Sequence, residues 1–129
     1  QLVAQKYIDN GYEIISRNFE YKTGEIDIIA KQNNSIVFIE VKTRTNTEIS
    51  QPTDAINKRK RRNIVKTAEY FCYKQKLDLY GYFYRFDVAT VIFDKSTKNY
   101  NIEILESAFD SKGDSLWIYF YYVNLFKHR

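Results

Sequence analysis

The stretch that decides the fold is Ile36-Val37-Phe38-Ile39-Glu40-Val41-Lys42. Apolar residues occupy both alternating faces, which is typical of a central strand, and we expect that strand to cover residues 35–42. Because side chains of a strand alternate with a period of two, Glu40 and Lys42 share one face. Charged side chains among buried apolar ones cost free energy unless they are paired or used in function. The stretch therefore predicts the middle of a sheet with a candidate site at its carboxyl end.

Turn-forming residues divide the rest of the chain into alternating elements. Short turns at residues 22–24 and 32–34 indicate that the strands they join form an antiparallel meander. A helix before the next strand provides the long connection that a parallel pair needs. The expected elements are a helix at 2–10, strands at 12–21, 25–31 and 35–42, a polar loop at 43–53, a helix at 54–76, and strands at 82–94 and 100–105. The order α-β-β-β-α-β-β predicts an α/β domain with a mixed central sheet flanked by helices.

A second acid lies in the preceding strand, within Gly24-Glu25-Ile26-Asp27-Ile28-Ile29. A short hairpin could bring Asp27 beside Glu40, and two neighbouring carboxylates favour a hard divalent cation such as Mg²⁺ or Mn²⁺ between them. Lys42 could then hold an attacking water or stabilise charge that develops on a phosphate. The same residues are compatible with an ordinary cross-strand ion pair on a solvated edge, and the pattern alone favours neither interpretation.

Positive charge is concentrated in one segment of the chain. The sequence has 20 basic and 16 acidic residues, so its formal net charge is +4. Residues 54–76 contain eight basic residues against two acidic ones, so this segment carries +6 and the rest of the chain −2. The expected helix could lie along a phosphate backbone through Lys58, Lys60, Arg61 and Arg62. A solvated helix face without any nucleic acid explains the charge equally well.

Composition excludes several classes of protein. Apolar residues make up 44% of the chain and charged residues 28%, which is typical of a globular domain and not of a disordered one. No apolar run reaches the length of about 20 residues that spans a bilayer. The single cysteine, Cys72, cannot form an internal disulfide, so we expect a cytoplasmic protein with Cys72 in its core. Most tyrosines should pack in strands, with Tyr7, Tyr21 and Tyr82 as candidates for contact with nucleotide bases.

An acid followed after about a dozen residues by Glu-x-Lys on a central strand is the signature of the PD-(D/E)xK nucleases, which share the restriction-endonuclease-like fold. Within this superfamily the chain resembles the YraN-like family of uncharacterised bacterial proteins, and it is similar to archaeal Holliday-junction resolvases. The resemblance covers roughly residues 1–110. The matching stretches are residues 4–8, 11–15, 17–19, 24–27, 37–44, 85–88 and 108–109, together with Pro52, Ala55 and Lys60.

The resemblance implies roles for individual residues. Asp27 and Glu40 would hold the metal with the backbone carbonyl of Val41, and Lys42 would be the catalytic lysine. Glu25 would be an accessory acid. Phosphates would face Arg44, just past the strand, and Lys60 on the helix.

Three positions depart from the family pattern. Gln1 stands at or just after the place where these nucleases often have one more acid on the first helix, and glutamine carries no negative charge. Glu20 replaces a residue that is usually basic, and Ser50 replaces a usual glycine. For Arg85 and Asp87 a structural pair is at least as good an explanation as a substrate contact, and we expect no catalytic role for His128.

We therefore predict an endonuclease-like domain at residues 1–110 that hydrolyses nucleic-acid phosphodiester bonds with Mg²⁺ or Mn²⁺, with DNA, including branched DNA, as the favoured partner. Resolvases of this fold act as dimers because they cut two strands; for this chain the sequence leaves open whether it forms a homodimer. Residues 111–129 form an aromatic extension that we expect to pack on the domain or on a second subunit. Two alternatives stay open: a nucleic-acid-binding module that keeps the fold without turnover, and a protein-interaction domain built on residues 116–126.

Overall fold

The structure is a computed structural model that describes residues 2–47, 56–77 and 80–114. Within these residues, two helices and five strands follow one another in the predicted order α-β-β-β-α-β-β. The elements are α1 (Leu2–Asp9), β1 (Glu13–Tyr21), β2 (Gly24–Gln32), β3 (Ser35–Thr45), α2 (Lys58–Lys74), β4 (Phe83–Phe93) and β5 (Tyr100–Phe109).

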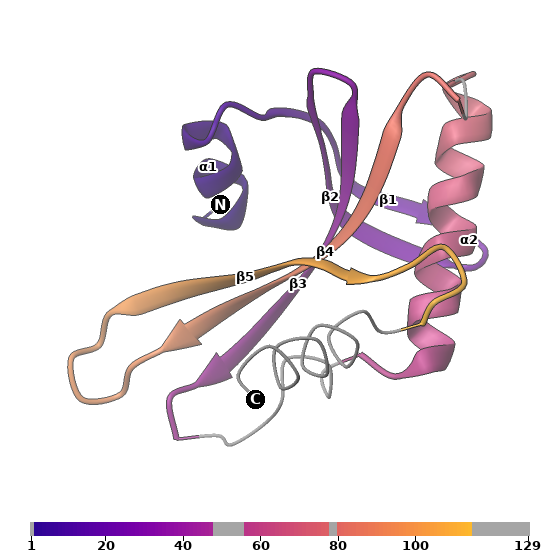
Figure 1. Cartoon of the computed structure of the whole chain (residues 1–129). Helices are drawn as coiled ribbons and strands as arrows, with labels where there is room; N and C mark the ends of the chain where they lie inside the picture. The colour runs from indigo at the N-terminus through magenta and orange to yellow at the C-terminus, as the bar shows by residue number, and fades with distance from the viewer. Residues whose placement is uncertain (1, 48–55, 78–79, 115–129) are drawn as a thin grey trace, which may run out of the picture.

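The five strands form one mixed sheet in the order β1-β2-β3-β4-β5 (Figure 1). The first three strands are joined by short turns and pair antiparallel, which confirms the predicted meander. Strands β3 and β4 are parallel and in continuous register from Ser35↔Phe83 to Thr45↔Phe93, with α2 in the connection between them. Strand β5 returns antiparallel beside β4. The predicted α/β fold class and its mixed sheet are therefore confirmed.

Each face of the sheet has its own hydrophobic cluster. On one face Phe38 of β3 packs with Phe71 and Cys72 of α2, so the cysteine lies in the core as predicted. On the other face Val37 packs with Tyr7 of α1. Alternation along β3 therefore assigns its even-numbered residues to the α2 face and its odd-numbered residues to the α1 face.

Strand β3 is longer than the sequence predicted. It continues to Thr45, so Arg44 lies within the strand and not just past it, and the loop that was expected from residue 43 begins later. Strand β4 provides the reason, because Arg44 pairs with Ile92 and Thr45 with Phe93 in the parallel ladder. A long apolar neighbour stabilises polar residues in a strand beyond the point where their own apolar pattern ends.

Helix α2 begins later than predicted. Asn57 is its N-cap, and the Asn57 side chain accepts a hydrogen bond from the Lys60 backbone N–H at 2.8 Å. Asp54, at which the helix was expected to begin, lies outside the described residues. Asparagine and aspartate are equally good caps, so local preference does not choose between them. Among the described residues, no helix is both long and apolar enough to cross a membrane.

Candidate functional site

The candidate site lies where strands β2 and β3 separate. Their ladder runs from Gln32↔Ser35 to Ile28↔Ile39 and goes no further. At the same level of β1, Asn18 has a left-handed φ of 52°, a conformation that asparagine tolerates better than most residues. In the gap beyond the last pair, Asp27 Oδ2 accepts a hydrogen bond from the Val41 backbone N–H at 2.7 Å. The carboxylate of Asp27 therefore lies between the two strands, beside the residue that follows Glu40.

Glu40 projects from β3 towards α2 and is only 7% exposed. The Nζ atom of Lys60, from the first turn of α2, lies 2.9 Å from Glu40 Oε1. The Nζ atom of Lys42 lies 3.8 Å from the same oxygen. The structure therefore brings together Glu40, Lys42 and Lys60, with Asp27 close enough to act on all three electrostatically.

The charges in this cluster shift one another's protonation. Burial raises the pKa of the Glu40 carboxyl; the hydrogen bond from Lys60 opposes this shift and the charge of Asp27 adds to it. The pKa of Lys42 is lowered, first by its hydrogen bond with Lys60 and then by burial. Burial also lowers the pKa of Lys60, but its hydrogen bonds with Lys42 and Glu40 outweigh that effect and the net shift is upward. Two lysines and two acids thus form one electrostatic unit.

The oxygen atoms around the gap match the preference of a hard divalent cation. In a regular strand the N–H and C=O groups of one residue point to the same edge, so the Val41 carbonyl faces the side on which its N–H meets Asp27. A cavity of about 400 Å³ opens beside Val41 and Asp27, with Arg17, Asn18 and Ile28 as its other walls. Carboxylate and carbonyl oxygens are the ligands that Mg²⁺ and Mn²⁺ prefer.

The donor set is small but sufficient. Among the residues that the structure describes, no three or more His, Cys, Asp or Glu side chains converge as a metal-binding group. Mg²⁺ commonly binds through one or two carboxylates and takes its other ligands from water and substrate phosphates. Asp27, Glu40 and the Val41 carbonyl therefore fit such an ion, with room left for a substrate.

Some predicted site residues lie away from this cluster. Glu25 is exposed and pairs across the hairpin with Glu20, so it does not join Asp27 and Glu40. Arg44 lies 3.8 Å from Glu103 of β5, beyond Lys42 along β3. The positions at Gln1, Ser50 and His128, and the aromatic segment at 116–126, lie outside the described residues.

The basic residues at the start of α2 divide between two kinds of contact. Arg61 donates from Nε to the Gly113 carbonyl and from Nη1 to the Ile56 carbonyl, both at 2.7 Å. Lys58 pairs with Asp114 at 2.9 Å. These contacts attach the residues after β5 to α2, a structural use that charge counting alone did not reveal. Lys60 is the helix residue that reaches the acidic cluster.

A second buried acid, Asp87, belongs to a structural network on the opposite face. Arg85 donates to it from Nε at 2.8 Å and from Nη2 at 2.9 Å. Tyr7 of α1 donates its hydroxyl at 2.7 Å, and the Ser107 N–H of β5 donates at 3.0 Å. The expected Arg85–Asp87 pair is therefore present. Tyr7 is buried by the same network, which removes it as a candidate for base contact.

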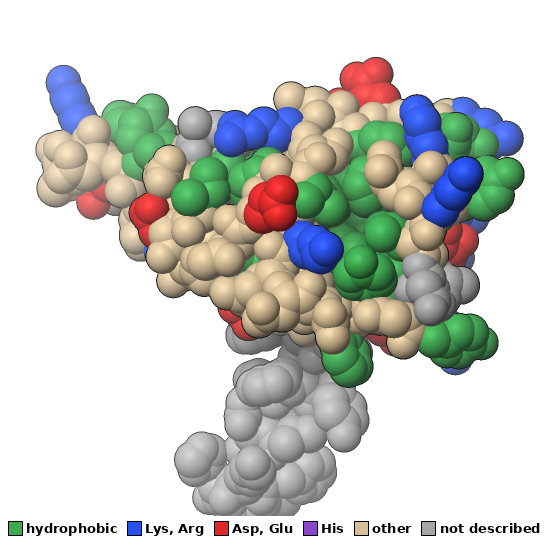
Figure 2. Space-filling view, turned by 90° about the horizontal axis from the view of Figure 1, so that it is seen from above, with side chains coloured by type: hydrophobic (Ala, Val, Ile, Leu, Met, Phe, Trp, Pro, Cys, Tyr) green, Lys and Arg blue, Asp and Glu red, His purple; other side chains and the backbone are tan. Residues whose placement is uncertain are grey.

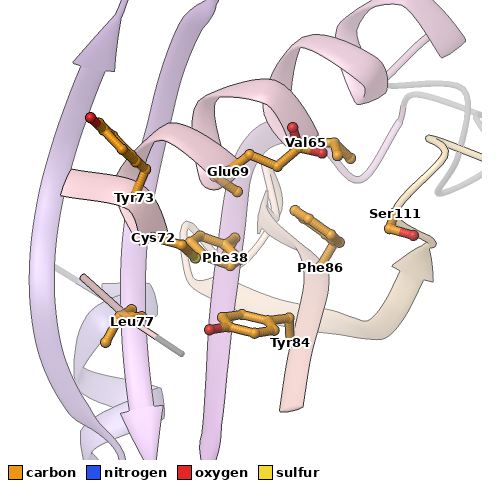
Figure 3. A pocket seen from close by; sticks show the side chains of 10 residues that line it. Phe38, Val65, Glu69, Cys72, Tyr73, Leu77, Tyr84, Phe86 and Ser111 are labelled. Carbon is orange, nitrogen blue, oxygen red and sulfur yellow. The ribbon is translucent and has the colours of Figure 1, made fainter. Parts of the chain in front are cut away.

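An apolar groove lies on the other flank of α2, away from the acidic cluster. Its volume is about 510 Å³. In Figure 3, Phe38 and Phe86 from the sheet face Val65 and Cys72 of α2, and Tyr84 borders the same hollow. Glu69 is the charged residue among its walls, so the groove is a poor match for a phosphate backbone.

Comparison with known proteins identifies relatives across most of the chain. The model of the uncharacterised protein family UPF0102 matches residues 1–91. A UPF0102 protein of Clostridium botulinum strain 657 is 48% identical over 110 residues, which cover 84% of this chain and 89% of the relative. A UPF0102 protein of Caldicellulosiruptor saccharolyticus is 44% identical over 99 residues, which cover 77% of this chain and 82% of the relative. These matches confirm the family part of the resemblance, and the names of the relatives state no activity.

Proposed function

This chain belongs to the uncharacterised protein family UPF0102, and we propose that it is a nuclease of the PD-(D/E)xK type that hydrolyses nucleic-acid phosphodiester bonds with Mg²⁺ or Mn²⁺. DNA, including branched DNA, is the favoured substrate. The observation that carries the proposal is the meeting of Asp27, Glu40 and Lys42 at the point where β2 and β3 separate. Two acids and a lysine at a strand divergence suit phosphodiester hydrolysis better than they suit a surface ion pair, because Glu40 is buried.

The roles follow from the positions of the side chains. Asp27, Glu40 and the Val41 carbonyl would hold a divalent ion, and such an ion would supply Lewis-acid polarisation of the phosphate and of the attacking water. Lys42, whose Nζ atom lies 3.8 Å from Glu40 Oε1, would orient that water or stabilise negative charge on the phosphate. In the reaction, water oxygen bonds to phosphorus, the ester bond to the leaving oxygen breaks, and the proton from water reaches that oxygen through solvent.

Basic residues near the cluster would hold the phosphate backbone. Lys60 lies against Glu40, and Arg59 and Arg62 are exposed on the same end of α2. Arg17 borders the cavity beside Asp27. Neutralising phosphates with lysine and arginine provides sequence-independent affinity that falls as salt rises. The proposed enzyme therefore recognises the backbone and the shape of its substrate, because phosphate contacts carry no sequence information.

The decisive experiment is a cleavage assay on branched, single-stranded and duplex DNA of equal length with Mg²⁺ or Mn²⁺. We expect cleavage of at least one substrate by the unaltered chain and a loss of about 100-fold or more in Lys42→Ala, the scale expected when an electrostatic stabiliser is removed. Lys95→Ala, at an exposed turn between β4 and β5, is a matched control that should cleave normally. Equal cleavage by the unaltered chain and Lys42→Ala on every substrate would contradict the proposal.

One observation favours a second candidate, a nucleic-acid-binding module without turnover. Glu40 already has an ammonium partner at 2.9 Å, so Lys60 could substitute for a metal permanently. Calorimetric titration with Mn²⁺ separates the two candidates. The nuclease requires binding that Asp27→Asn abolishes, whereas the module requires nucleic-acid binding that neither Mn²⁺ nor Asp27→Asn changes.

A further inference from the structure

Three tyrosines form an aromatic surface where the β1–β2 hairpin crosses α2. The rings of Tyr21 and Tyr70 are stacked, with centroids 3.6 Å apart and planes 23° apart. The ring of Tyr73 follows at 6.5 Å from Tyr70, tilted by 58°. Tyr73 is 83% exposed and Tyr21 is 36% exposed. We call Tyr21, Tyr70 and Tyr73 the tyrosine platform; Tyr21 and Tyr73 are exposed, and Tyr70 is partly buried between them.

Contacts between the β1–β2 hairpin and α2 hold the tyrosine platform in place. The tip of the hairpin passes across the middle of α2 (Figure 1). There Thr23 and Thr67 share a hydrogen bond of 2.7 Å, and Thr67 is fully buried. Phe19 of the hairpin packs edge-on against Phe71 of the helix, with centroids 5.1 Å apart. Because hairpin and helix are joined at both points, the aromatic surface is formed before any ligand arrives, which lowers the entropic cost of binding.

Three lysine side chains lie beside the tyrosine platform. The Nζ atom of Lys22 lies 5.5 Å from the centroid of the Tyr21 ring. Lys66 and Lys74 are exposed and lie one helical turn before and after Tyr70. These three lysines take part in no ion pair within the described residues. On the α2 side of the molecule, exposed hydrophobic side chains have lysine and arginine side chains beside them (Figure 2).

The tyrosine platform is close to the acidic cluster. Tyr70 follows Lys60 by ten residues of helix, which is about 15 Å along the axis. Gly24, the partner of Tyr21, precedes Asp27 by three strand residues, which is about 10 Å. At about 3.4 Å per nucleotide of stacked strand, these distances correspond to three or four nucleotides. A strand whose phosphate lies at the cluster can therefore reach the platform.

We propose that the tyrosine platform stacks the unpaired bases of a single-stranded segment bound next to the Asp27–Glu40 cluster. Proteins commonly bind single-stranded nucleic acid through aromatic rings flanked by lysines. Such binding has little sequence preference, because every base has a flat face that can stack on a ring. In a continuous duplex those faces are covered by neighbouring base pairs. The inference rests on the proposed function and deepens it, since it specifies substrates with unpaired nucleotides, such as single strands, overhangs and branches.

The test measures binding of a fluorescein-labelled oligothymidylate and of an abasic strand of equal length and charge, in EDTA so that metal and cleavage have no part. We expect the unaltered chain to prefer the oligothymidylate. Tyr73→Ala should weaken oligothymidylate binding about 5- to 150-fold, the range for loss of one stacked base, and leave abasic binding unchanged. Tyr73 is exposed, so this change should not disturb folding. The matched control is Tyr100→Ala, a 62% exposed tyrosine at the start of β5, which should bind both strands normally.

Tyr21→Leu provides a second variant, because leucine keeps apolar contact with Tyr70 but has no aromatic face. It too should lower oligothymidylate affinity and spare the abasic strand. Equal binding of the two strands by the unaltered chain, or unchanged binding by both variants, would overturn the platform and leave the nuclease proposal standing. Binding to neither strand nor to any duplex would overturn both. If the surface instead serves a protein partner, Tyr73→Ala will not alter affinity for any nucleic acid.

Discussion

Two buried acids in neighbouring strands have opposite surroundings. Glu40 of β3 pairs with Val88 of β4, and Asp87 of β4 pairs with Ile39 of β3, so they are next to each other in the sheet but face opposite sides. Asp87 is fully buried and accepts hydrogen bonds from a planar guanidinium, a phenol and a backbone N–H. Glu40 has two flexible lysines and a second carboxylate nearby.

The comparison distinguishes an acid that maintains the fold from one that is available for chemistry. A buried carboxylate whose oxygens all have rigid donors is costly to remove and has no capacity for a new ligand. Glu40 has repulsion from Asp27 that a cation would relieve, and its lysine partners are partly exposed and can turn towards solvent. Burial alone therefore does not identify a site; the partners of the buried group do.

The largest effect is expected for Asp87→Ala. The change leaves the Arg85 guanidinium, the Tyr7 hydroxyl and the Ser107 N–H without their acceptor, so the free energy of unfolding should fall by about 3–5 kcal/mol. Urea denaturation followed by circular dichroism measures this loss. Glu106→Ala, which removes the exposed acid 3.8 Å from Arg85, is the control and should unfold normally. A small loss of unfolding free energy in Asp87→Ala would mean that the Asp87 network contributes little to stability.

A smaller loss, about 1.5–3 kcal/mol, is expected for Tyr7→Phe, because one hydrogen bond to a charged acceptor is removed and the others remain. This residue also predicts an alkaline pH dependence. Burial, followed by the charge of Asp87 and the hydrogen bond to it, raises the pKa of Tyr7 above its ordinary value of 10.0.

Below pH 10 both the folded and the unfolded chain keep the phenol proton, so Tyr7 makes no difference to the pH profile. Above pH 10 the unfolded chain loses the proton while the folded chain retains it, and the free energy of unfolding falls with a slope of up to about 1.4 kcal/mol per pH unit. Urea titrations between pH 9 and 11 should show this slope in the unaltered chain and a shallower one in Tyr7→Phe. Equal slopes in the two chains would show that the Tyr7 hydroxyl is solvated in the folded protein.

Glu40→Gln should change the free energy of unfolding by less than about 1 kcal/mol, the range for ion pairs whose cations keep contact with water. Glutamine relieves the repulsion from Asp27, while Lys42 and Lys60 retain access to water. Mn²⁺ should raise the melting temperature of the unaltered chain by binding its folded state, and Glu40→Gln should abolish that rise. Melting curves with and without Mn²⁺ provide both quantities. A loss as large as that of Asp87→Ala would remove the distinction between the two acids.

The smallest effect is expected at the exposed ion pair of Lys58 and Asp114, whose side chains are both 51% exposed. Water screens such pairs, so Lys58→Ala should not change the midpoint of the unfolding transition. Comparison in low and high salt checks this expectation. A marked loss of stability would show that attachment of the residues after β5 depends on this pair and not on Arg61.

Much of the site could be predicted because its information is local. Alternation in residues 36–42 is enough to place Glu40 and Lys42 on one face, and a short turn is enough to bring Asp27 to the next strand. The hydrogen bond from Val41 to Asp27 could not be predicted, because it depends on where the ladder stops. One signal was present in the sequence: Asn18 lies inside the predicted strand at 12–21, and asparagine adopts a left-handed φ more readily than most residues.

Other contacts join residues that are far apart in the chain. Tyr7 meets Asp87 across 80 positions, and Thr23 meets Thr67 across 44. No local preference predicts such pairs, since each requires that two elements are already packed. For the same reason Arg61 was expected to face phosphates, whereas its guanidinium in fact binds the carbonyls of Ile56 and Gly113.

By itself the sequence determined the order of the helices and strands, the central position of β3 and the common face of Glu40 and Lys42, since these depend on short-range periodicity and turns. The tertiary structure decided which acid is held rigidly, which lysine reaches Glu40, and where the tyrosines of the β1–β2 hairpin and α2 meet. These outcomes depend on the packing of elements that are distant in sequence, and their free energy exists only once the sheet and its two helices are assembled.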